Sequence, residues 1–126
     1  MKASLFYLPT VANRREIEAG LASMRPELYQ RMLRDISEQV QLADDLGYDS
    51  VSFTEHHFHI EGFEVSNNPV LLDLYLPARS KSCAAGRRST GCFATPITAS
   101  CNSLVPHDVL MKTIERFWTE VMPRVA

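Results

Sequence analysis

The chain has 126 residues, the length of one modest domain, and 45% of them are hydrophobic, which is normal for a globular protein. Its formal net charge of −2 gives no electrostatic reason to expect nucleic acid or an anionic membrane as a partner. The average hides an asymmetry, because residues 1–77 hold 6 basic and 12 acidic side chains whereas residues 78–126 hold 7 and 3.

The cysteines and the hydropathy pattern bear on the cellular compartment. Cys83, Cys92 and Cys101 are nine residues apart and form no CxxC pair, so they do not describe a disulfide framework and indicate a reducing cytoplasm. No apolar run approaches the roughly 20 residues that cross a bilayer. The stretch after Lys2 loosely imitates a signal peptide, but Pro9 and the charged residues that follow favour a first strand.

The first part of the chain predicts a strand and a long helix. Ser4–Leu8 is a continuous apolar run of strand length, typical of a strand buried on both faces of a parallel sheet. Residues 13–24 could form a short helix, although Gly20 weakens it. A long amphipathic helix begins at Pro26 and ends before Gly47. Its apolar stripe has spacings of four, four, four and three: Leu28, Met32, Ile36, Val40 and Ala43.

A second strand, Ser50–Thr54, follows this helix after a short link. Strand, helix and strand together form a βαβ unit, which implies a parallel sheet and the α/β class. Further on, Asn68 and Pro69 predict the N-cap and first residue of a short helix over residues 70–75, which Pro77 ends.

The remainder divides into two parts. Residues 78–104 are rich in Ser, Ala, Cys, Gly and basic residues and show no helical or strand period, so we expect an irregular or disordered segment. An amphipathic helix follows, with His107 and Asp108 in its first turn and Pro123 at its end. The expected organisation is therefore a βαβα portion over 1–77, an irregular segment over 78–104 and a C-terminal helix over 105–126.

Three of the four histidines, His56, His57 and His59, stand next to Glu55 at the carboxyl end of the second strand. In parallel sheets functional residues gather at this edge. Strand alternation puts His56 and His57 on opposite faces, so they do not readily share a metal ion, whereas Glu55, His57 and His59 could. Acid/base chemistry by a histidine with a neighbouring carboxylate is the second possibility, and a solvated loop is the third.

Longer stretches of the chain resemble a known family. LADDLGYDSVSFTEHHF, followed within ten residues by NNPVLLDLYL, is similar to the N-terminal signature of the bacterial luciferase-like flavin monooxygenases. The opening KASLFYLP resembles the family's first barrel strand, and MKTIERFWTEVMPRV is similar to its C-terminal helix. The likeness extends over residues 1–77 and, more loosely, over 106–125.

The resemblance implies a TIM barrel that binds reduced FMN, delivered by a separate flavin reductase, and uses oxygen to oxidise an aldehyde or another small organic substrate. His56 matches the family's acid/base histidine, and Glu55 and His57 match the positions that flank it. Thr54 and Asn68 would line the flavin pocket. A relative in the same superfamily uses a deazaflavin, which these residues do not distinguish from FMN.

The chain also departs from that family. A (β/α)₈ barrel needs roughly 200 residues or more, and 126 residues leave room for only the first one or two βα units and the C-terminal helix. We therefore expect a partial TIM-type barrel with an internally deleted or out-of-frame segment over about 78–104. Such a fragment would be inactive alone and, if folded, a homodimer. The alternatives are a non-catalytic fragment that self-associates through its helices and, less well supported, a His/Cys metal-binding protein.

Overall fold

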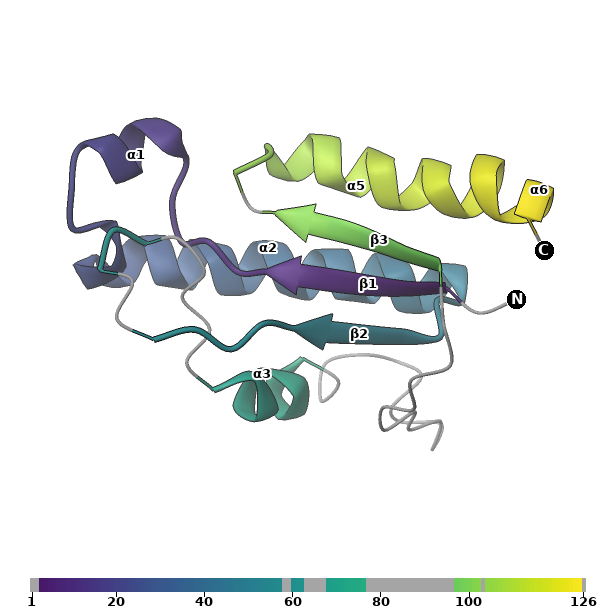
Figure 1. Cartoon of the computed structure of the whole chain (residues 1–126), viewed down its shortest axis with the longest axis horizontal. Coiled ribbons are helices and arrows are strands. Elements are labelled where there is room, and N and C mark those ends of the chain that lie inside the picture. The colour runs from purple at the N-terminus through teal and green to yellow at the C-terminus, as the bar shows by residue number, and fades with distance from the viewer. Residues whose placement is uncertain (1–2, 58–59, 63–67, 77–96, 103, 126) are drawn as a thin grey trace.

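The computed structural model describes residues 3–57, 60–62, 68–76, 97–102 and 104–125 (Figure 1). The elements run in chain order as follows: β1 (Ala3–Leu8), α1 (Arg14–Glu18), η1 (Ala22–Met24), α2 (Pro26–Leu46), β2 (Ser50–Phe53), α3 (Pro69–Tyr75), β3 (Ile97–Asn102), α5 (His107–Arg116), the π-helical η3 (Phe117–Val121) and α6 (Met122–Val125). Strands and helices alternate along the described chain, which confirms the mixed α/β class.

The described strands form one parallel sheet in the order β2-β1-β3, with β1 in the centre. Leu5 pairs with Val51 on one side and with Ala99 on the other. At the start of the sheet the Ala3 amide donates to Asp49 Oδ2 at 2.8 Å, and the Asp49 amide donates to the Ala3 carbonyl at 2.9 Å. These bonds fix the register of the βαβ unit that the sequence predicts.

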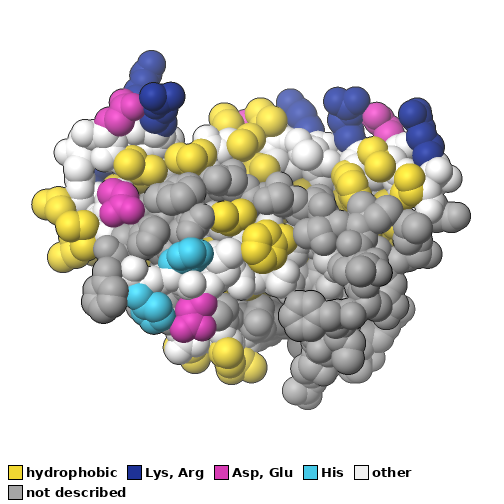
Figure 2. All heavy atoms as spheres, in the orientation of Figure 1, with side chains coloured by type: hydrophobic (Ala, Val, Ile, Leu, Met, Phe, Trp, Pro, Cys, Tyr) yellow, Lys and Arg dark blue, Asp and Glu magenta, His cyan; other side chains and the backbone are white. Residues whose placement is uncertain are grey.

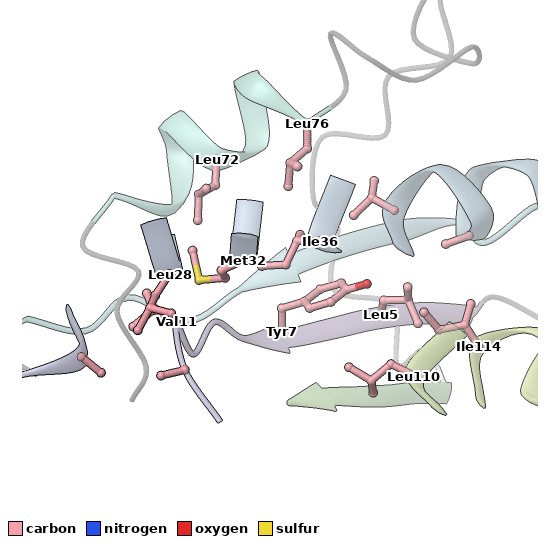
Figure 3. Packing of buried hydrophobic residues seen from close by; sticks show 14 residues of the cluster. Leu5, Tyr7, Val11, Leu28, Met32, Ile36, Leu72, Leu76, Leu110 and Ile114 are labelled. Carbon is pink, nitrogen blue, oxygen red and sulfur yellow. The ribbon is translucent and has the colours of Figure 1, made fainter. Parts of the chain in front are cut away.

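Helices α2, α3 and α5 pack on one face of this sheet, and α2 lies directly behind β1 in Figure 1. Alternation along β1 sends Leu5 and Tyr7 into that layer, where they are at most 1% exposed. Figure 3 shows Leu72 and Leu76 of α3 pointing toward α2. The hydrophobic core therefore lies between one face of the sheet and the helices.

The long helix matches its prediction closely. α2 runs from Pro26 to Leu46, and all five residues of the predicted stripe are buried. Gly47 ends it with φ of 93°, a left-handed conformation that glycine adopts without a Cβ clash. A side chain there would also approach the Trp118 ring, since a Cβ at this position would lie 3.4 Å from Cζ2.

The short helix expected over residues 13–24 is instead two pieces. α1 spans Arg14–Glu18, starting with an Asn13–Glu16 capping box, and η1 spans Ala22–Met24. Gly20 interrupts them at φ of 87°, outside helical space. The glycine that weakened the prediction therefore marks the point where the helix stops.

The segment expected to be irregular contains a strand. β3, Ile97–Asn102, pairs along its whole length with β1. Its sequence, ITASCN, offers only Ile97 and Thr98 as good strand formers, so the pairing with β1 explains the strand better than local propensity does. Residues 78–96, with Cys83, Cys92 and the four basic residues Arg79, Lys81, Arg87 and Arg88, lie outside the described residues.

The C-terminal helix continues past its predicted end at Pro123, through η3 and α6 to Val125. Tyr48, in the link between α2 and β2, holds this helix: its hydroxyl donates to the Ile114 carbonyl at 2.8 Å, and its ring centroid lies 5.0 Å from that of Trp118. In the described part of the chain, no helix combines the length and the apolar character needed to cross a membrane.

Truncation of Ile36 tests this core. Ile36 is 1% exposed at the centre of the cluster, so we expect Ile36→Ala to lower the free energy of unfolding by about 2 to 5 kcal/mol, because it leaves a cavity. Urea denaturation followed by circular dichroism measures this. Arg34→Ala, at an exposed position of the same helix, is the matched control and should change stability little; equal losses in both variants would contradict the packing described.

Candidate functional site

The candidate site lies where β1 and β2 end, at the carboxyl edge of the sheet. Thr54 extends the ladder by one residue, since its amide donates to the Tyr7 carbonyl at 3.1 Å. Its hydroxyl oxygen is buried and has no hydrogen-bond partner among the described residues. A buried hydroxyl without a partner is costly, so Thr54 Oγ1 is a polar atom at this edge whose hydrogen-bonding capacity is unused among the described residues.

Glu55 and His57 lie together beyond this residue. His57 Nε2 is 3.1 Å from Glu55 Oε1, and the two side chains are 53% and 60% exposed. His56, between them in the chain, is partly buried. The strand-like alternation expected for these three residues is therefore present, with Glu55 and His57 on one side. Figure 2 shows histidine and acidic side chains next to each other on the face of the molecule turned to the viewer.

Two hydrogen bonds attach the loop after β2 to the loop after β1 and to η1. The Gly62 carbonyl accepts from the Val11 amide at 2.9 Å, and Ser23 of η1 donates through its hydroxyl to the Ile60 carbonyl at 2.7 Å. Gly62 has φ of 98°, and a Cβ at this position would lie 2.7 Å from Val11 Cγ2. Only glycine fits this close approach, so it sets the path of the chain that follows the Glu55–His57 segment.

The other predicted site residue, Asn68, has a structural role. Its Oδ1 accepts from the Leu71 amide at 3.0 Å and caps α3, as the sequence predicts. His59 lies outside the described residues, and within those that are described no three His, Cys, Asp or Glu side chains form a group that could hold a metal ion.

A second polar region, between α2 and α5, was not predicted as a site. Gln39 and His107 are hydrogen-bonded there beside a cavity. Position 39 falls three residues after Ile36 and four before Ala43, so helical spacing already directs it inward. A polar residue at a core position was the signal available in the sequence, but its partner on α5 is 68 residues away.

Arg31 and Glu16 form a bidentate ion pair next to this region. The guanidinium donates to both carboxylate oxygens, at 3.0 and 2.7 Å. These hydrogen bonds from Arg31 are the main reason that the pKa of Glu16 lies below its ordinary value of 4.5, and the Asn13 amide adds to the effect while partial burial opposes it. The pair attaches α1 to α2.

Comparison with known proteins adds no assignment: no family model matches the chain, and no curated protein or solved structure shows significant similarity to it.

The lowered pKa of Glu16 predicts how stability depends on pH. Because the carboxylate is favoured in the folded state, its contribution is complete above pH 4.5 and is lost as pH falls through the lower folded pKa. We expect Glu16→Gln to cost at most about 1 kcal/mol at neutral pH, since the pair is partly exposed, and the difference from the wild type to vanish in acid. Denaturation between neutral pH and acid measures it.

Arg31→Gln provides the matched background for that experiment. Without the guanidinium the pH-dependent effect of Glu16→Gln on stability should shrink, because Arg31 is the largest cause of the lowered pKa. An effect of unchanged size would mean that the Asn13 contact, and not the ion pair, supplies the stability.

Proposed function

We propose that this chain is a shortened relative of the luciferase-like monooxygenases, with Glu55, His56 and His57 at the site where reduced flavin and a small organic substrate such as an aldehyde would meet. The observation that carries the proposal is the position of this segment at the carboxyl edge of a parallel sheet, directly after β2. That edge is where barrel enzymes place catalytic residues.

The arrangement of α3 and β3 supports a barrel origin. Right-handed connections would put the helices before and after β2 on opposite faces, because β3 lies beyond β1. α3 instead packs on the same face as α2. In a closed barrel all helices lie outside the sheet and the last strand returns to pair with the first. We therefore propose that β3 corresponds to the closing strand; between β2 and β3 the described residues contain no further strand.

The residues at this edge fit part of what a flavin needs. The buried hydroxyl of Thr54 has no partner among the described residues and could accept or donate one hydrogen bond. His56 is partly buried, and His57 Nε2 lies 3.1 Å from Glu55 Oε1, so that Glu55 orients the His57 ring. Reduced FMN, or a deazaflavin in its place, would supply the electrons for the oxidation.

The same geometry argues that the isolated chain does not turn over. The side chains of Glu55 and His57 are more than half exposed, whereas oxidation of a substrate at a reduced flavin requires a site from which water is excluded. The strands that would complete such a site in a full barrel have no counterpart among the described elements. We therefore propose flavin binding without productive oxidation.

Flavin titration tests this proposal. We expect FMN fluorescence to be quenched with a Kd on the order of tens of micromolar, and His56→Gln to weaken binding several-fold because it removes the ionisable ring at the site. Lys112→Gln, which removes an exposed ionisable side chain on α5, is the control and should bind like the wild type. Absence of any change at tens of micromolar FMN would refute the flavin assignment for this chain.

A non-catalytic, self-associating fragment is the second candidate, and α3 supplies the observation for it. This short helix carries four large apolar residues whose exposed fractions lie between 44% and 66%: Val70, Leu71, Leu74 and Tyr75. Exposed apolar clusters of this kind favour protein contacts. A second copy of the chain would cover them by pairing α3 with its own symmetry mate.

Light scattering after size-exclusion chromatography tests the second candidate. If α3 forms the contact, the wild type should have the mass of a dimer and Leu74→Asp the mass of a monomer, because a carboxylate cannot be buried unpaired in that contact. Leu21→Asp, at an equally exposed leucine outside α3, should leave the dimer intact. A monomeric wild type would rule out self-association as the function.

A further inference from the structure

A cavity of about 310 Å³ lies between the N-terminal parts of α2 and α5, next to the loops that follow β1 and β3. Its apolar wall includes Val11, Met32 and Leu110, each at most 5% exposed. Its polar wall combines side chains of α2 with His107 of α5 and with Thr10 and Asn13 of the loop after β1. This volume is at the lower end of the range for small-molecule sites. It is separate from the Glu55–His57 segment, none of whose residues lines it.

One buried polar atom in the cavity wall has no partner among the described residues. Gln39 is 2% exposed, and its Oε1 makes no hydrogen bond there. His107 explains the orientation of the amide: its Nε2 lies 3.1 Å from Glu38 Oε2, a carboxylate that only accepts, so in the neutral ring Nε2 carries the proton. Nδ1 therefore accepts from Gln39 Nε2 at 3.0 Å, and Oε1 remains as an unsatisfied acceptor.

The charges around the cavity favour a cation. Three polar residues of α2 line the cavity, and each lies four positions after the one before: Arg31, Asp35 and Gln39. Arg31 is engaged by both oxygens of Glu16 and is also attracted to Asp35. Glu16 therefore neutralises Arg31 on the cavity wall, and Asp35 is the carboxylate that lines the cavity together with the unsatisfied Gln39 acceptor.

We propose that this cavity binds a small primary amine with a branched apolar part. The ammonium group donates to Gln39 Oε1 and is attracted by Asp35, and the alkyl part lies against the apolar wall formed by Val11, Met32 and Leu110. The three requirements of the site are then met together: a donor for the buried acceptor, a positive charge, and apolar bulk. The proposal does not depend on flavin binding elsewhere in the chain.

Titration of the full chain with 3-methylbutylamine tests the proposal, with the nitrogen-15 shifts of the Gln39 side-chain amide as the readout. We expect saturable shifts with a Kd of about 1 mM, a reasonable affinity for a ligand with so few atoms. The 3-methylbutanoate anion, which has the same alkyl part and the opposite charge, should not bind. Absence of saturable shifts with the amine, or equal binding of the anion, would overturn the assignment.

Variants of α2 assign the contacts. Gln39→Leu should weaken amine binding about tenfold or more, since a hydrogen bond to a charged donor is lost, and Asp35→Asn should weaken it through the charge alone. Gln41→Leu is the matched control, because Gln41 lies on the same helix and does not line this cavity; it should bind like the wild type. Unchanged binding in Asp35→Asn and Gln39→Leu would refute the site.

Discussion

The rest of the structure depends on the pairing of β1 with a strand on each side. β1 brings Ser50–Phe53 and Ile97–Asn102 into one parallel sheet, although they lie far apart in the sequence. Its inward residues, Leu5 and Tyr7, are covered by helices from both halves of the chain. Without β1 neither flanking strand has a partner among the described elements, and a single strand cannot satisfy its backbone hydrogen bonds.

This central position also creates two polar regions with different chemistry. At the end of β2 the sheet presents Glu55, His56 and His57 in an open and largely solvated arrangement. The loops after β1 and β3 run instead toward α2 and α5, where they enclose Gln39 and His107 beside a cavity. An ionisable group at an open edge keeps its hydration, whereas a buried acceptor without a partner makes ligand binding favourable.

The position of α2 and α3 on the same face of the sheet bears on the proposed barrel origin. The sequence resemblance concerns short stretches, whereas the position of α3 beside α2 is a property of the whole arrangement. A doubly wound sheet of this strand order would put α3 on the other face. Two independent observations therefore support the barrel proposal. The first is that α3 packs on the same face of the sheet as α2, and the second is the Glu-His-His sequence after β2.

The sequence alone determined those elements that depend on residues close together in the chain. The apolar stripe of α2, its end at Gly47, the strand before Glu55 and the Asn68 cap all follow from spacing and from conformational preferences of single residues, and all are present. The Glu55–His57 contact likewise follows from strand alternation. Only the tertiary structure decided that Ile97–Asn102 is a strand and that Gln39 meets His107. Their partners lie 94 and 68 residues away, and weak local propensity cannot reveal a hydrogen-bonding partner that folding brings from so far along the chain.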